Sequence, residues 1–196
     1  MARRSISGVA MLGAGALALI GCSQPVKGAD SPPAPASAPT GDAAIVASAL
    51  AAAPAAIGQD ATVVEVKSDG SMRTVRSGAN GFTCTPDDPS TPGPDPMCMD
   101  ANGMAWMMAI EAHKPPPVGK TGLIYMLQGG MDASNTDPFA TKPAAGADWV
   151  KTGPHVMVVG DPSILASYPG GSKPDTTKPY VMFGGTPYAH LMAPVR

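Results

Sequence analysis

The sequence predicts an α+β domain with a predominantly antiparallel sheet, about two packing helices and one disulfide. Short β-rich runs separated by loops of Gly, Pro, Asn and Asp occupy the second half of the chain. Helical spacing is confined to two segments, and Cys84 and Cys98 form an even pair of cysteines in the predicted domain. Strands joined by short loops, with helices packed on the sheet, account for these observations together.

The first 21 residues are typical of a lipoprotein signal peptide. Arginines at positions 3 and 4 precede an almost wholly apolar run over 6–20, and Leu19-Ile20-Gly21-Cys22 resembles the lipobox of bacterial lipoproteins. Cys22 is then the lipidated first residue of the mature protein, anchored by acyl chains such as palmitate. Ser23 resembles the residue that sends lipoproteins to the outer membrane, so we expect an envelope protein facing the periplasm. An ordinary signal peptide with a chance cysteine is the alternative.

The rest of the chain divides into a tether and one domain. Residues 22–42 are mainly Ala, Pro, Ser and Gly and predict an extended tether, whereas 43–196 are long enough for a single globular domain. The chain has 13 Lys and Arg against 15 Asp and Glu, with no basic cluster. Nucleic acid is therefore not an expected partner.

The predicted elements follow from local patterns. Residues 43–57 have the spacing of a helix that Pro54 ends or kinks, and 61–67 and 72–75 are predicted strands joined by a turn at Asp69-Gly70. Asp100 predicts the N-cap of a helix that ends near His113, before three prolines. Further strands are predicted over 123–128, 154–159, 179–183 and 189–195.

Cys84 and Cys98 predict a disulfide, because an even pair of cysteines in an exported chain is usually oxidised. On the chain-entropy account, closing this short loop stabilises the fold by roughly 3 kcal/mol. A soft-metal or redox role for the two thiols is the alternative.

Two His-x-Met pairs predict a candidate metal site. His155 with Met157, and His190 with Met192, stand two residues apart in predicted strands, so each pair projects from one face. If the strands are neighbours, two imidazoles and two thioethers meet, and this ligand set suits copper as Cu(I). The alternative is plain core packing, because Met fills cores in chains that are poor in aromatic residues, and this chain is 5% aromatic.

A hydrolase is a further alternative. Ser134 or Thr136, with Asp137 and either His155 or His190, supplies the residue types of a catalytic triad. The chain has no Gly-x-Ser-x-Gly nucleophile elbow, however, and almost any chain of this length contains such a trio.

Two polar segments have simpler interpretations. Asn135-Thr136-Asp137-Pro138 predicts a turn in which the Asn side chain bonds local backbone. Asp87, Asp88, Asp95 and Asp100 surround the predicted disulfide and contain the ligand type of Ca²⁺. Their spacing fits no EF-hand, and solvated loop acids are the simpler interpretation.

The order of several short motifs resembles a family of uncharacterised bacterial exported proteins. The motifs are Gly81-Phe82-Thr83-Cys84, Asp95-Pro96-Met97-Cys98-Met99-Asp100, Tyr125-Met126-Leu127-Gln128-Gly129-Gly130, Ala133-Ser134-Asn135-Thr136-Asp137-Pro138-Phe139, Gly153-Pro154-His155 and Gly185-Thr186-Pro187-Tyr188-Ala189-His190. The resemblance covers residues 43–196 and implies a domain boundary but no activity and no catalytic residues. Such proteins tend to have Trp where Phe82 and Phe183 stand here, which is a difference in packing.

Taken together, these patterns favour a lipid-anchored envelope protein that binds rather than catalyses. Its expected partners are the membrane, through the anchor, and an unknown envelope protein or small ligand. Copper binding by the two His-x-Met pairs is the second hypothesis, and hydrolysis is the third.

Overall fold

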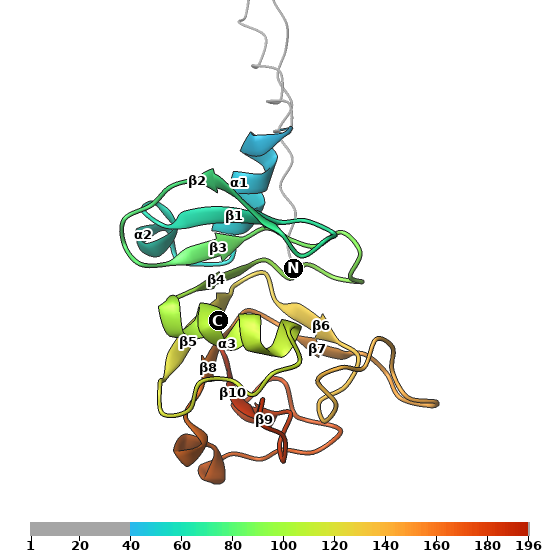
Figure 1. Cartoon of the computed structure of the whole chain (residues 1–196). Helices are drawn as coiled ribbons and strands as arrows, with labels where there is room; N and C mark the ends of the chain where they lie inside the picture. Colours follow the sequence, from blue (N-terminus) through green and yellow to red (C-terminus); the bar gives the residue numbers. More distant parts are fainter. Residues whose placement is uncertain (1–39, 196) are drawn as a thin grey trace, which may run out of the picture. The chain divides into compact units, whose positions relative to one another are not determined.

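The computed structural model describes residues 40–195 and confirms the predicted α+β class, with a large and mostly antiparallel sheet (Figure 1). The signal peptide, Cys22 and nearly all of the tether lie outside the described residues. Within 40–195, no helix has both the length and the apolar character that crossing a membrane requires.

The helices and strands of the domain follow one another in a fixed order. They are α1 (Asp42–Leu50), α2 (Ala55–Gly58), β1 (Thr62–Val66), β2 (Met72–Arg76), β3 (Thr83–Thr85), β4 (Met97–Met99), α3 (Ala101–Glu111), β5 (Gly122–Met126), β6 (Gly130–Asp132), β7 (Val150–Thr152), β8 (His155–Val159), the 3-10 helix η1 (Pro162–Ser167), β9 (Tyr180–Met182) and β10 (His190–Pro194). The predicted break at Pro54 separates α1 from α2, and the predicted hairpin forms β1 and β2.

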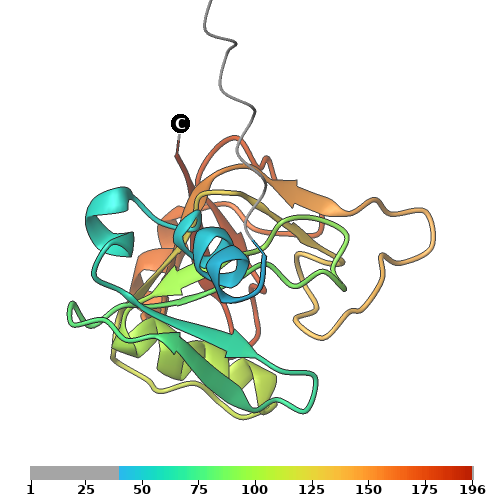
Figure 2. The ribbon, with the colours of Figure 1, turned by 90° about the horizontal axis from the view of Figure 1, so that it is seen from above.

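Eight strands form one sheet in the order β2-β1-β3-β4-β5-β8-β10-β9. Every neighbouring pair is antiparallel except β1 and β3, which run parallel. A separate hairpin pairs β6 with β7, and the 133–149 connection between them projects from the body of the domain (Figure 2). The four strands β5, β8, β10 and β9 therefore lie side by side although they come from distant parts of the chain.

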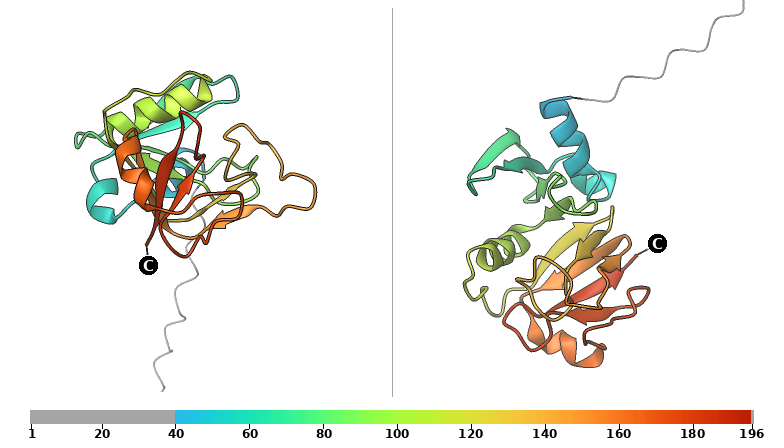
Figure 3. Two further views of the ribbon diagram at one scale, coloured as in Figure 1. Left: turned by 90° about the horizontal axis from the view of Figure 1, so that it is seen from below. Right: turned by 90° about the vertical axis from the view of Figure 1, so that its right-hand side faces the viewer.

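The two main helices cover opposite faces of the sheet. In β4, Cys98 belongs to the cluster under α1, and its neighbour Met99 belongs to the cluster under α3. Successive residues of a strand point to opposite faces, so the two clusters are on different sides of the sheet. Figure 3 shows α1 and α3 at separate parts of the sheet. The larger cluster, under α3, contains most of the buried methionines.

The predicted disulfide between Cys84 and Cys98 is present. The two residues are directly opposite in the antiparallel pair β3–β4, and both are fully buried. The patterns used to predict strands missed β3 and β4, because a strand of three residues is too short to show an alternation of polar and apolar side chains.

Asp100 fixes where α3 begins and how it meets the sheet. Its Oδ1 accepts a hydrogen bond of 2.7 Å from the backbone N–H of Gly103, as predicted for an N-cap. Its Oδ2 accepts a hydrogen bond of 3.1 Å from the N–H of Leu123 in β5. One carboxylate therefore caps the helix and joins it to the sheet.

Gly103 allows α3 to approach β5 closely. A Cβ at this position would lie 2.8 Å from the carbonyl oxygen of Leu123 and 2.9 Å from Cγ1 of Ile124. Gly122 is the facing residue on β5, and a Cβ there would collide with the backbone of Gly103. Because backbone atoms line this contact, the chain cannot relieve the collision by turning a side chain.

We expect Gly103→Ala to lower the free energy of unfolding by about 2–3 kcal/mol, because the added methyl group overpacks the contact between helix and sheet. Intrinsic helix propensity alone would stabilise the variant by about 1 kcal/mol. Gly58→Ala in α2 is the control, since its Cβ would meet only Leu50, at an ordinary 3.5 Å. Urea unfolding of the three proteins checks this, and a neutral Gly103→Ala would contradict it.

Candidate functional site

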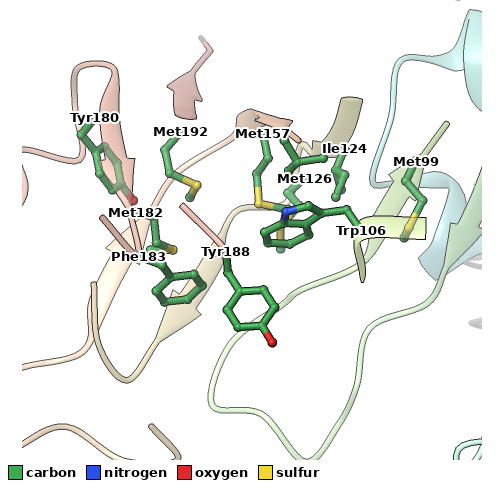
Figure 4. Packing of buried hydrophobic residues seen from close by; sticks show 11 residues of the cluster. Met99, Trp106, Ile124, Met126, Met157, Tyr180, Met182, Phe183, Tyr188 and Met192 are labelled. Atoms are coloured by element: carbon green, nitrogen blue, oxygen red, sulfur yellow. The ribbon is translucent and has the colours of Figure 1, made fainter. Parts of the chain in front are cut away.

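A group of His and Met side chains occupies one face of the four strands β5, β8, β10 and β9, on the side covered by α3. We call this group the His–Met face, and its members are Met126, His155, Met157, Met182, His190 and Met192. All six are buried, and both His155 and His190 are no more than 2% exposed. Figure 4 shows the methionines of this face with Trp106, Phe183 and Tyr188 packed among them.

The strand register determines which members are neighbours. Met157 in β8 lies directly opposite Met192 in β10. His155 is opposite Pro194 at one end of this pair of strands, and His190 is at the other end. Four residues of strand correspond to about 13 Å. The structure therefore brings the two thioethers of the predicted site together and places the two imidazoles at opposite ends of the face.

Both histidines are held in the same way. The Nδ1 of His155 bonds the carbonyl oxygen of Gly153 at 2.7 Å, and the Nδ1 of His190 bonds that of Tyr188 at 2.9 Å. A carbonyl oxygen only accepts, so each Nδ1 carries the proton and each Nε2 keeps a free lone pair. Both Nε2 atoms are buried and have no hydrogen-bond partner among the described residues. Unpaired buried polar atoms are costly, so each one needs an explanation.

Burial keeps these imidazoles neutral. Desolvation lowers the pKa of His190 to about 4; the carbonyl of Tyr188 opposes this shift, and the charge of His155 adds a smaller lowering. Desolvation also lowers the pKa of His155. Neutral imidazole is the form of histidine that binds metal ions.

Two members of the face, Met126 and Met182, were not among the predicted ligands. Met126 in β5 is directly opposite His155, and Met182 in β9 is directly opposite His190. The sequence contains a signal for them, since Tyr125-Met126-Leu127-Gln128-Gly129-Gly130 and Tyr180-Val181-Met182-Phe183-Gly184-Gly185 are similar in pattern. Each segment ends a strand of the face at a Gly pair.

Aromatic rings surround His190. The ring centroid of Trp106 is 5.0 Å from that of His190, and the ring of Phe183 is 5.4 Å away. Phe183 has φ 55°, a left-handed conformation that is unfavourable for a bulky residue. Its N–H donates to the carbonyl of Asn135 at 2.8 Å, and its own carbonyl accepts from the Thr186 hydroxyl at 2.8 Å. The surrounding structure thus holds a strained residue against His190.

The predicted turn at Asn135–Pro138, with the Asn135 side chain bonding local backbone, is wrong: residues 135 and 136 form a bend, and the hydrogen-bonded turn runs from Asp137 to Ala140. The side-chain nitrogen of Asn135 donates to the distant carbonyls of Gly171 and Val181, at 2.6 and 3.0 Å. Local backbone bonds are made instead by Ser134, whose Oγ accepts from the N–H groups of residues 136 and 137, and by Asp137. Asn135 is 1% exposed, and a buried amide reaches distant partners that the sequence does not identify.

The residues proposed for a hydrolase triad are not hydrogen-bonded to one another as a triad requires. The Oγ of Ser134 lies 3.3 Å from Oγ1 of Thr136, and Asp137 accepts from the N–H of Phe139. The nitrogens of His155 and His190 bond either a backbone carbonyl or nothing in the described chain. No hydroxyl is therefore paired with a base here.

The acidic residues around the disulfide mostly bond backbone. Asp95 and Asp87 each accept a hydrogen bond from the backbone of the same loop, and Asp100 caps α3. Across residues 40–195, no three His, Cys, Asp or Glu side chains are grouped to hold a metal ion. Asp132 in β6 is close to this loop, and burial, followed by the charge of Asp95, raises its pKa to about 6.

We expect Asp132→Asn to stabilise the protein at pH 7 by about 1–2 kcal/mol, after allowance for partial solvation. The folded-state pKa is raised, so the unfolded chain ionises first and stability falls as the pH rises from about 4 to 6. The gain should therefore vanish near pH 4.

Urea unfolding at the two pH values measures this difference. Asp175→Asn is a control of opposite sign, because hydrogen bonds from Thr177 and Lys178 lower the pKa of Asp175 to about 2. A pH-independent effect of Asp132→Asn would contradict the assignment.

Comparisons with known proteins identified no relative of this chain. The chain matches no family model, no curated protein and no solved structure. The resemblance to uncharacterised bacterial exported proteins therefore stays a prediction, and the His–Met face is the feature that bears on function.

Proposed function

We propose that this protein is a lipid-anchored envelope protein that binds Cu(I) on the His–Met face. One observation carries the proposal: two buried, neutral imidazoles have unpartnered Nε2 atoms on a face that is rich in thioethers. Each Nε2 has a free lone pair, and no N–H or O–H group within residues 40–195 donates to it. A bound metal ion would accept that lone pair and so give the nitrogen a partner. His155, Met157, His190 and Met192 are the proposed ligands.

The hydrogen bonds at Nδ1 support metal binding. A metal-binding histidine usually donates its other ring N–H to a carbonyl or carboxylate, which fixes the tautomer and the ring orientation. His155 and His190 both do this through the carbonyl two residues earlier in the chain. The two histidines are therefore oriented as ligands before any ion is bound.

The chemistry of the face favours Cu(I) over harder ions. Thioethers and imidazoles are soft or intermediate ligands, whereas Ca²⁺ and Mg²⁺ require oxygen. Structural Zn²⁺ sites commonly use thiolates, and here Cys84 and Cys98 are joined in a disulfide under the opposite face. An apolar, buried cluster also disfavours the hydrated Cu(II) ion.

The lipid anchor would place this site in the envelope. We propose that Cys22 carries the lipid and that the Ala- and Pro-rich tether joins it to the domain, which begins with α1 at Asp42. In this arrangement the domain faces the periplasm from the outer membrane. Its partners would be the membrane and the proteins that deliver or receive copper.

Binding of an envelope protein or small ligand is a second candidate function. The candidate site for such a partner is a groove of about 220 Å³ with a mostly apolar lining. The lining residues are Pro115, Pro116, Pro117, Val118, Gly160, Pro162, Thr186, Pro187 and Ala189. Val118 is 84% exposed, and exposed apolar grooves are common sites of protein contact.

We expect the full chain, with the Cys84–Cys98 disulfide intact, to bind Cu(I) in competition with a chromophoric chelator. Met157→Leu with Met192→Leu should weaken binding by roughly 100-fold or more, because both central thioethers are lost. Met→Leu conserves volume and usually costs less than about 1.5 kcal/mol, so the fold should survive.

Met108→Leu is the matched control, because Met108 is 52% exposed on α3 and lies outside the face. Its affinity should equal that of the unchanged protein. If the unchanged protein binds no Cu(I), the copper proposal fails and the proline-lined groove becomes the leading candidate.

A further inference from the structure

We infer that the His–Met face holds two Cu(I) ions in two equivalent sets of ligands, rather than one ion among four residues. The first set is His155, Met126 and Met157, and the second is His190, Met182 and Met192. This inference rests on the proposed function and adds Met126 and Met182, together with a stoichiometry of two.

The register gives each histidine the same two methionine neighbours. Met126 lies directly across from His155 on β5, and Met157 follows His155 by two residues on β8. In the second set, Met182 lies directly across from His190 on β9, and Met192 follows His190 by two residues on β10. Residues directly opposite, or two apart on a strand, project from the same face. One arrangement therefore occurs twice.

Distances favour ligation within a set over ligation between the histidines. Directly opposite residues have Cα atoms about 4.5–5.5 Å apart, and residues two apart on a strand are separated by about 7 Å. Methionine side chains are long and flexible enough to converge over such spans. The Cα atoms of the two histidines are separated by about 13 Å along the strands, and side chains project roughly perpendicular to a sheet, so each imidazole is closer to the methionines of its own set than to the other imidazole.

Two members of the first set lie near the same glycine. A Cβ at Gly130 of β6 would lie 3.2 Å from Cε of Met126 and 3.7 Å from Cε1 of His155. The Met126 methyl group and the carbon between the two ring nitrogens of His155 are therefore both next to Gly130, which has no side chain to separate them.

The second set is enclosed by aromatic residues. Trp106 and Phe183 contact the ring of His190, and the indole Nε1 of Trp106 is itself buried without a partner among the described residues. An aromatic ring beside a bound cation contributes a favourable cation–π interaction. Trp106 is near His190, whereas the ring pairs of the described chain include none with His155. Trp106 contacts the ring of His190, and it also lies in the same cluster as Met126 and Met157 of the first set, so its fluorescence should respond to both sets and more strongly to the second.

The experiment uses full-length Trp149→Phe protein, in which Trp106 is the only tryptophan that remains. Cu(I) is titrated against a chromophoric chelator while the emission of Trp106 is recorded. We expect two equivalents to bind, one of which quenches Trp106 more strongly than the other. Met126→Leu should remove the weakly quenching equivalent, and Met182→Leu should remove the strongly quenching one.

Each remaining equivalent should keep its affinity within about threefold, since β8 and β10 separate Met126 on β5 from Met182 on β9 and neither residue belongs to the other set. Circular dichroism and thermal unfolding confirm that both variants are folded. A single equivalent that both variants abolish, or that neither variant weakens, would overturn the two-site inference while leaving the proposed function intact. Absence of Cu(I) binding to the unchanged protein would instead reject both.

Discussion

The register of β5, β8, β10 and β9 is the constraint on which the rest of this structure depends. Side chains alternate between the two faces of a sheet, so a slip of one residue in β8 or β10 would move its His and Met to the other face. The antiparallel ladders bring Met157 against Met192 and give each histidine a methionine on a neighbouring strand. Backbone pairing therefore determines which soft side chains meet.

Several features help to fix that register. Asp100 bonds both α3 and β5, and the glycines at 103 and 122 let the helix lie close to the sheet. On the far edge, the amide of Asn135 bonds the carbonyl of Val181, and its backbone carbonyl bonds Phe183. These polar contacts are on β5 and β9, the two outer strands of the face. The apolar packing between them is not directional, so it does not fix the register by itself.

Local patterns were enough to predict the α+β class, the hairpin of β1 and β2, the cap at Asp100 and the disulfide. Each of these depends on residues that are close in sequence or on a single pair of cysteines. The patterns could not predict that β9 and β10 pair at the edge, or that Met182 lies opposite His190, because strand order arises from contacts between distant segments. Likewise, Asn135 looked like a local turn residue, and only its burial reveals the bonds to Gly171 and Val181.

The burial of His155 and His190 also affects how fast any ligand of these histidines can exchange. Neither imidazole is more than 2% exposed, so neither can be reached from solvent while the segments packed over it stay in place. Any ligand of these nitrogens must enter and leave during a local opening of the domain, so its exchange rate is limited by that opening. A buried site of this kind is suited to retaining its ligand. It would release a bound ion at the rate of local opening of the domain, which is slower than dissociation of the same ligand in water.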